Sequence, residues 1–173
     1  MSDDKKLGDN QHGTNMKPNH SSSIRYAHTN LVARNWEAMR DFYVDLFDCE
    51  PVGSVRDRAG TVVEQLTGIE GIAVVGQHLR LPGYEEGGPT LEIFQFTPTD
   101  EIPLPVLNNP GFTHLAFEVP DVEEKRQQIL LRGGDDVGER VTLDIEGAGK
   151  LTLMYVTDPE GNIIELQHWD TPN

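Results

Sequence analysis

The sequence predicts an α+β fold built from two βαβββ modules. The chain has 173 residues, which is the size of one domain or of two small fused halves. A predicted strand followed by a helix N-cap occurs twice at the same spacing. His28 lies seven residues before Asn35, and His114 lies seven residues before Asp121, so both members of the pair recur after 86 residues. This internal repeat indicates two modules of the same kind.

Hydrophobic spacing assigns the elements of the first half. Residues 24–33 alternate as a strand, and Asn35 stands at the N-cap of an amphipathic helix. The apolar residues of that helix recur at helical spacing: Trp36, Met39, Phe42, Tyr43, Leu46 and Phe47. Three further strands are predicted over 50–56, 72–81 and 90–96, separated by turns that contain Gly or Pro. The segment 61–68 fits neither pattern.

The second half repeats this order after a proline-rich segment. Four prolines within thirteen residues make 98–110 a linker, because proline suits neither a helix interior nor a central strand. The predicted elements that follow are a strand over 112–119, a helix from Val122 to the stop at Gly133 and Gly134, and strands near 140–143, 151–156 and 162–167. The predicted organisation is a flexible tail over 1–23, a first module over 24–97, the linker, and a second module over 111–173.

Composition excludes several classes of function. The formal charge is −15 with neutral histidines and the pI is about 4.6, so nucleic acid and anionic membranes are not expected partners. The chain has no run of ~20 apolar residues, and its first 23 residues lack a signal-peptide core, so we expect a soluble cytoplasmic protein. The single cysteine, Cys49, excludes an internal disulfide and any multi-cysteine metal site.

Strand alternation places one histidine and one glutamate of each half on the same face. Side chains alternate across a strand, and the helix of each module covers only one face of its sheet. The apolar set packs on the helix, which leaves His28 and Glu92 on the free face of the first half. The same parity leaves His114 and Glu165 on the free face of the second half.

This set of two histidines and two glutamates predicts a metal site. A carboxylate buried in an apolar strand costs several kcal/mol unless it is paired or binds a cation. Two neutral imidazoles and two carboxylates suit one Zn, Ni, Co, Mn or Fe ion at an octahedral site that keeps two positions open for water or substrate. In the structural alternative the histidines are ordinary hydrogen-bonded residues and the glutamates pair with Arg25 or Arg80.

Four segments resemble the motifs of the vicinal oxygen chelate superfamily, which includes glyoxalase I, methylmalonyl-CoA epimerase, extradiol dioxygenases, and fosfomycin and bleomycin resistance proteins. The segments are HTNLVARNWEAMRDFYVDLF, PTLEIFQF, GFTHLAFEV and DPEGNIIELQ, and the resemblance covers about 24–169. It implies that His28, Glu92, His114 and Glu165 bind the metal. It also implies that the paired modules form a curled mixed sheet around a central cup, which a second subunit often completes, so we expect a homodimer.

Glu92 favours glyoxalase-like chemistry within that superfamily. The resemblance places Glu at this position in glyoxalase-like members, Gln in the epimerases, and only three protein ligands in the extradiol dioxygenases. The implied reaction is that of a metal-dependent lyase or isomerase that stabilises an enediolate of a small carbonyl or thioester substrate, with Glu165 or Glu92 as the proton shuttle. The alternatives are a CoA-thioester epimerase, a ring-cleaving oxygenase, and a resistance protein that sequesters a drug or metabolite without turnover.

Other residues of the free faces are candidates for the substrate pocket. Phe94, Phe96 and Tyr155 give the cup an aromatic lining, and Asn30 shares the face of the first histidine. Arg56 or Arg58 supplies local positive charge for an acidic substrate in an otherwise acidic protein. The position four residues after the first histidine is valine, where bacterial glyoxalase I commonly has an arginine for glutathione. His78 lies outside the repeat and is predicted to be structural.

Overall fold

The structure is a computed structural model that describes residues 24–100, 103–104 and 106–170. The flexible tail predicted over 1–23 lies outside the described residues. The first half contains β1 (His28–Val32), α1 (Trp36–Phe47), β2 (Glu50–Ala59), α2 (Thr61–Thr67), β3 (Ala73–Arg80) and β4 (Thr90–Thr97). The second half contains β5 (His114–Glu118), α3 (Val122–Leu131), β6 (Val141–Ile145), β7 (Gly149–Thr157) and β8 (Ile163–Asp170). The predicted α+β class with two βαβββ modules is confirmed.

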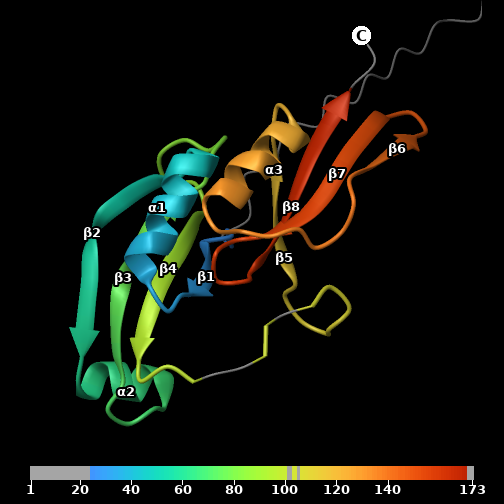
Figure 1. Ribbon diagram of the computed structural model, residues 1–173. Helices are drawn as coiled ribbons and strands as arrows, with labels where there is room; N and C mark the ends of the chain where they lie inside the picture. Colours follow the sequence, from blue (N-terminus) through green and yellow to red (C-terminus); the bar gives the residue numbers. More distant parts are fainter. Residues whose placement is uncertain (1–23, 101–102, 105, 171–173) are drawn as a thin grey trace, which may run out of the picture.

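Each module forms its own four-stranded mixed sheet (Figure 1). The strand orders are β1-β4-β3-β2 and β5-β8-β7-β6, so the two sheets have the same topology. In each sheet the first and last strands of the module pair in parallel, and the remaining neighbours pair in antiparallel fashion. Strands β1 and β5 therefore occupy equivalent edges, next to the strands that carry the two glutamates.

Both predicted N-caps are present. The side chain of Asn35 accepts a hydrogen bond of 3.1 Å from the backbone N–H of Ala38 at the start of α1. The Asp121 carboxylate accepts bonds of 2.8 and 3.0 Å from the backbone N–H groups of Glu123 and Glu124 at the start of α3. These bonds satisfy donors that the first turn of a helix leaves free, and they fix where each helix begins.

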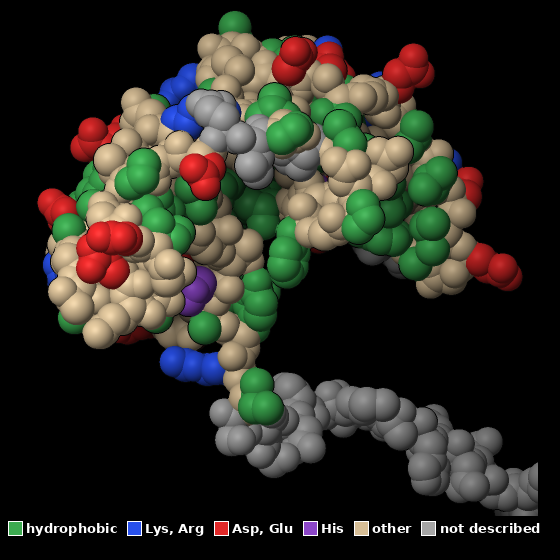
Figure 2. Space-filling view, turned by 90° about the horizontal axis from the view of Figure 1, so that it is seen from below, with side chains coloured by type: hydrophobic (Ala, Val, Ile, Leu, Met, Phe, Trp, Pro, Cys, Tyr) green, Lys and Arg blue, Asp and Glu red, His purple; other side chains and the backbone are tan. Residues whose placement is uncertain are grey.

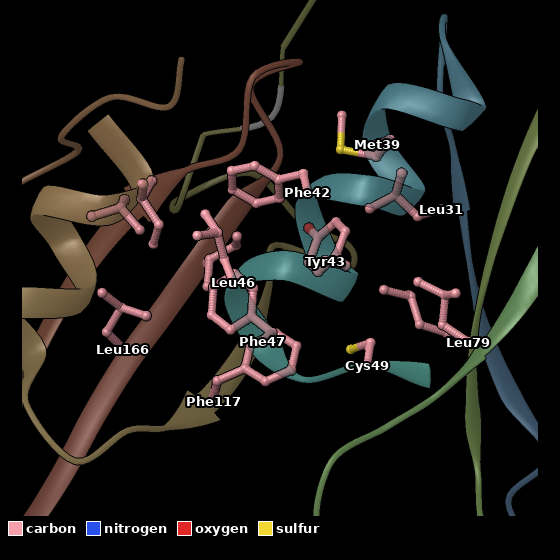
Figure 3. Close-up of a cluster of buried hydrophobic side chains, with 14 of the residues drawn as sticks. Leu31, Met39, Phe42, Tyr43, Leu46, Phe47, Cys49, Leu79, Phe117 and Leu166 are labelled. Atoms are coloured by element: carbon pink, nitrogen blue, oxygen red, sulfur yellow. The ribbon is translucent and has the colours of Figure 1, made fainter. Parts of the chain in front are cut away.

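The two long helices lie between the sheets and share one hydrophobic core. Figure 1 shows α1 and α3 side by side at the centre of the molecule, with one sheet on either side. The close-up in Figure 3 shows aromatic side chains of α1 facing the second module. The rings of Phe47 in α1 and Phe117 in β5 have centroids 4.3 Å apart, and Tyr43 is fully buried. Burial of these side chains stabilises the two modules as one unit.

Several predicted boundaries shift by one to four residues, and β2 and β8 each run three residues further than predicted, to Ala59 and Asp170. β1 begins at His28 rather than near residue 24, and the side chains of 24–27 are exposed. The carbonyl of Ala27 accepts a hydrogen bond from the backbone N–H of Thr90, where the paired strand begins. The ambiguous segment 61–68 is the short helix α2, which begins after Gly60 and buries only Val63. None of the described helices is long and apolar enough to cross a membrane.

Candidate metal centre

Each sheet has a face that neither α1 nor α3 covers, and we call it the open face. β1 and β5 have the same burial pattern, in which one residue in five is buried and the histidine that begins the strand is exposed. The buried residues, Leu31 and Phe117, point to the helices, so the histidines lie on the open faces. Figure 2 shows hydrophobic side chains on both halves beside the hollow between them, while acidic side chains lie around the periphery.

The first module brings its histidine and its glutamate together. Nε2 of His28 lies 3.5 Å from Oε2 of Glu92, and the Glu92 residue is only 8% exposed. Glu92 is in β4, which is the neighbour of β1 in the sheet. We call these two residues the N-terminal half-site.

Three further side chains surround the Glu92 carboxylate. Asn30 donates a hydrogen bond of 3.0 Å to Oε2, while His78 Nε2 and Arg56 Nη1 approach Oε1 at 2.7 and 3.7 Å. The cation beside Glu92 is therefore Arg56, rather than Arg25 or Arg80, and Arg80 pairs instead with Glu50. Arg56, whose side chain is exposed, and the neighbouring polar side chains offset part of the cost of removing this charge from water.

The second module repeats the arrangement with fewer partners. Nε2 of His114 lies 3.6 Å from Oε2 of Glu165 in β8, and these two residues form the C-terminal half-site. The Glu165 side chain is 17% exposed, compared with 10% for the Glu92 side chain. Tyr155 bonds to Glu165, and this hydrogen bond, followed by burial, raises the pKa of the Tyr155 phenol above its usual value.

His78, which the sequence interpretation predicts to be structural, lies against the Glu92 carboxylate. Its pKa is lowered, first by burial and then by the charges of Arg56 and His28, while Glu92 acts in the opposite direction. The register of two neighbouring strands places it there. His78 of β3 pairs directly with Glu92 of β4, so the two side chains share a face. The repeat in the sequence gave no hint, because the equivalent position in the second module is a tyrosine.

The separation of each donor pair is close to that of two ligands bound to one metal ion. Two ligands bound at about 2.1 Å to one ion lie about 3.0 Å apart at a right angle and about 3.4 Å apart at the tetrahedral angle. The N–O separations of 3.5 and 3.6 Å in the two half-sites are close to these values. Each pair thus fits half of a metal site. Within the described part of one chain, however, no three His, Cys, Asp or Glu residues are grouped so that they could hold an ion.

The remaining predicted pocket residues lie on both open faces. Phe94 lies against Gly76, where an added Cβ would come within 2.5 Å of its ring, and its ring contacts that of Phe96 with centroids 6.4 Å apart. Tyr155 lies beside His114, with ring centroids 5.3 Å apart. A groove of about 640 Å³ runs between the first strands of the two modules and is lined by Asn30 and His114, among others.

Comparison with known proteins assigns the family. The profile of the Glyoxalase/Bleomycin resistance protein/Dioxygenase superfamily matches residues 25–166, which is most of the chain. The chain belongs to this superfamily. No curated protein gives a significant match to it.

Solved structures of this superfamily share the fold at low sequence identity. A glyoxalase family protein from Bacillus cereus is 19% identical with a TM-score of 0.68, and the match covers 87% of this chain and 97% of that one. A glyoxalase/bleomycin resistance protein/dioxygenase domain from Frankia is 16% identical with a TM-score of 0.54, covering 88% and 96%. The fosfomycin resistance protein FosX from Listeria monocytogenes, solved with Mn(II) and sulfate, is 14% identical with a TM-score of 0.51, covering 85% and 93%.

Proposed function

We propose that this protein is a metal-dependent lyase or isomerase that acts beside the carbonyl group of a small substrate, in the manner of a glyoxalase. The observation that carries the proposal is the recurrence of one imidazole–carboxylate pair in each module, at 3.5 Å in the first and 3.6 Å in the second. A single divalent ion, one of Zn, Ni, Co, Mn or Fe, is held by His28, Glu92, His114 and Glu165. The Mn(II) in the structure of FosX supports a divalent ion in this fold.

The site is completed by two chains. Each described chain offers two half-sites but no group of three ligands, so the N-terminal half-site of one copy meets the C-terminal half-site of a second copy. A two-fold symmetric homodimer then has two equivalent sites, since each chain contributes one half to each. The open faces of both sheets carry exposed apolar side chains that such contact would bury, among them Val52 in β2 and Leu143 in β6.

The two glutamates have different roles in the proposed reaction. When bound, the metal supplies Lewis acidity that makes the carbon next to the substrate carbonyl easier to deprotonate. Glu165 is the proposed base, because its side chain is more exposed than that of Glu92 and fewer side chains surround it, Tyr155 and His114 among them. Glu92 accepts a hydrogen bond from Asn30 on one oxygen and has His78 and Arg56 beside the other, so it is suited to stay in place as a ligand.

The open face of the first module orients the substrate. Arg56 is half exposed and lies 3.7 Å from Glu92, so it is placed to hold an acidic group of a substrate bound at the metal. Phe94 and Phe96 offer apolar surface on the same face. The substrate is therefore a small carbonyl or thioester compound with an acidic group and an apolar part.

Mixing two variants tests the composite site. One variant carries H28A and E92Q, and the other carries H114A and E165Q. Alone, every site in either homodimer keeps only one half-site, so metal binding is weak. In a mixed dimer one site has both intact halves, and random mixing restores about a quarter of the wild-type sites. Metal content after gel filtration, measured on protein without a His tag, gives the result.

The outcomes separate the candidate functions. An intramolecular site would gain nothing from mixing, and a wild-type protein without metal would contradict the proposal in favour of a sequestering protein. Hemithioacetals, acyl-CoA epimers and catechols are then screened as substrates of the metal-loaded dimer. Oxygen consumption with catechols would contradict lyase or isomerase chemistry, whereas deuterium exchange beside a carbonyl supports it.

A further inference from the structure

We propose that His78 is a positioning residue that fixes the orientation of the Glu92 carboxylate, so that one oxygen is held in the sheet and the other is presented to the metal. This inference rests on the proposed function, because it concerns the N-terminal half-site. It adds a residue that takes no part in the internal sequence repeat.

The contacts of Glu92 divide between its two oxygens. His78 Nε2 lies 2.7 Å from Oε1, which is the shortest contact among the four side chains around the carboxylate. Asn30 donates a hydrogen bond of 3.0 Å to the other oxygen, Oε2, and Nε2 of His28 lies 3.5 Å from that oxygen. The oxygen that His78 touches is therefore not the one that faces His28. A carboxylate held in this way offers Oε2 as a ligand on the side of the metal-binding imidazole.

His78 is itself firmly placed. Its Nδ1 is 2.8 Å from Oγ1 of Thr90, and its side chain is 12% exposed. Its ring makes edge contacts with the rings of His28 and Phe94, at centroid distances of 5.4 and 6.0 Å. The Nε2 atom is buried and makes no hydrogen bond of standard geometry, although Glu92 Oε1 is 2.7 Å away. No other polar group of the described chain satisfies this nitrogen, so Glu92 is its partner.

The second module has a polar aromatic residue at the equivalent place. Tyr155 in β7 pairs with Glu165 in β8, as His78 in β3 pairs with Glu92 in β4. Tyr155 bonds to that glutamate, and its ring makes an edge contact with His114. In both modules an aromatic side chain with a polar atom therefore lies against the ligand glutamate and also contacts the ring of the ligand histidine. An imidazole in one module and a phenol in the other occupy the same position, which indicates that both orient the neighbouring glutamate.

Two isosteric substitutions test the role of Nε2. Gln has its amide nitrogen where the imidazole has Nε2, whereas Asn reaches only as far as Nδ1 and retains the contact with Thr90. Loss of a residue that orients a metal ligand typically weakens metal binding about 10- to 100-fold. We therefore expect H78N to raise the Kd for Zn²⁺ by about that factor, measured on the full-length dimer against a competing chelator, and H78Q to restore most of the affinity. The control is H168Q, because His168 bonds to Val119 outside both half-sites.

Two readouts do not depend on turnover. The visible absorption of the Co²⁺ form should change in H78N and return in H78Q, because it reports ligand geometry. In metal-free protein, the free energies of unfolding of H78N, E92Q and the double variant should be non-additive, since the two side chains are in contact. H78N with wild-type metal affinity, or H78N and H78Q equally weakened, would overturn the inference. If the wild-type protein takes up no metal, both the proposed function and this inference are wrong. If the wild-type protein and H78N take up metal equally well, only this inference is wrong.

Discussion

Tyr43 donates a hydrogen bond of 3.1 Å to Asp158, and this bond ties helix α1 of the first module to the turn that precedes β8 of the second. Both residues are almost completely buried, with exposed fractions of 0% and 1%. Asp158 also accepts bonds from the backbone N–H groups of Glu160 and Asn162 and from the Asn162 side chain. One carboxylate thus shapes the turn that leads into β8 and fastens it to the neighbouring module.

Replacing Tyr43 with phenylalanine should lower the free energy of unfolding by about 1–2 kcal/mol at pH 7. The ring still fills the core, but a buried carboxylate loses a donor. Urea unfolding followed by circular dichroism measures the change. The control is Y26F, because Tyr26 is mostly exposed and its hydroxyl contacts only Thr29 among the described residues, so its effect should stay within about 0.5 kcal/mol.

The effect of Y43F should also depend on pH. Burial raises the pKa of Asp158, while bonds from Asn162, Glu160 and Tyr43 act in the opposite direction. A raised folded-state pKa means that the stability contribution is fully present below the unfolded value of about 3.9 and is lost as pH rises through the folded value. Removing the Tyr43 hydroxyl raises the folded pKa further. The difference between Y43F and wild type should therefore be smaller at pH 4 than at pH 7, and an equal difference at both would contradict this account.

Gly76 should not tolerate alanine. A Cβ at this position in β3 would lie 2.5 Å from Cδ1 and 2.8 Å from Cα of Phe94, and it would also meet the carbonyl oxygen of Ile93. Such overpacking costs about 1–3 kcal/mol, and it would displace Phe94 from the open face. Thermal or urea unfolding of G76A measures this loss. Gly138 offers a matched control, because an added Cβ there meets no atom within 4 Å, and G138A should unfold like wild type.

Local sequence rules predicted the parts of the fold that depend on neighbouring residues. Asn35 and Asp121 are the N-caps that their side-chain chemistry predicts, and strand alternation correctly placed His28 and His114 away from the helices. These features need only the spacing of residues within one element. The repeat of 86 residues then extended them to the second module.

The parts that the sequence could not predict depend on strand register and on assembly. His78 faces Glu92 only because β3 and β4 pair with one particular register, which no local pattern specifies. The helix α2 buries a single residue, so it lacks the apolar periodicity that would have identified it. The packing of the modules decides whether the two half-sites meet within one chain or between two chains. Strand alternation and residue spacing carry no information about that packing.

Cys49 should be unreactive in the folded protein. Burial, with a smaller contribution from Asp48, raises the pKa of this thiol to about 12, so at pH 8 only about one molecule in 10⁴ carries the reactive thiolate. A disulfide reagent such as dithiobis(nitrobenzoate) should label the native protein far more slowly than the urea-unfolded chain, which offers one thiol per chain. The labelling rate should follow the urea unfolding curve. Rapid, complete labelling of the native protein would contradict the burial of Cys49 at the end of α1.

Replacing Glu165 with glutamine should abolish turnover while leaving the fold intact. Gln has nearly the same shape, can accept a hydrogen bond from Tyr155 through its amide oxygen, and retains that oxygen as a weaker ligand. It cannot remove a proton, and loss of a general base typically costs about 10²- to 10⁴-fold in rate. The assay is incorporation of deuterium from D₂O beside the carbonyl of whichever substrate the screen identifies. Urea unfolding and Zn²⁺ uptake of the same preparation report its fold and its metal site.

Glu118 provides the matched comparison for that experiment. It lies on the same open face as His114, four residues further along β5, and its side chain is exposed. E118Q removes the same charge without touching either half-site, so its exchange rate should equal that of the wild-type protein. If E165Q retained wild-type exchange, Glu165 would not be the base, and E92Q would become the variant to test. If E118Q and E165Q lost activity equally, the loss would reflect the general electrostatics of this face rather than proton transfer by one residue.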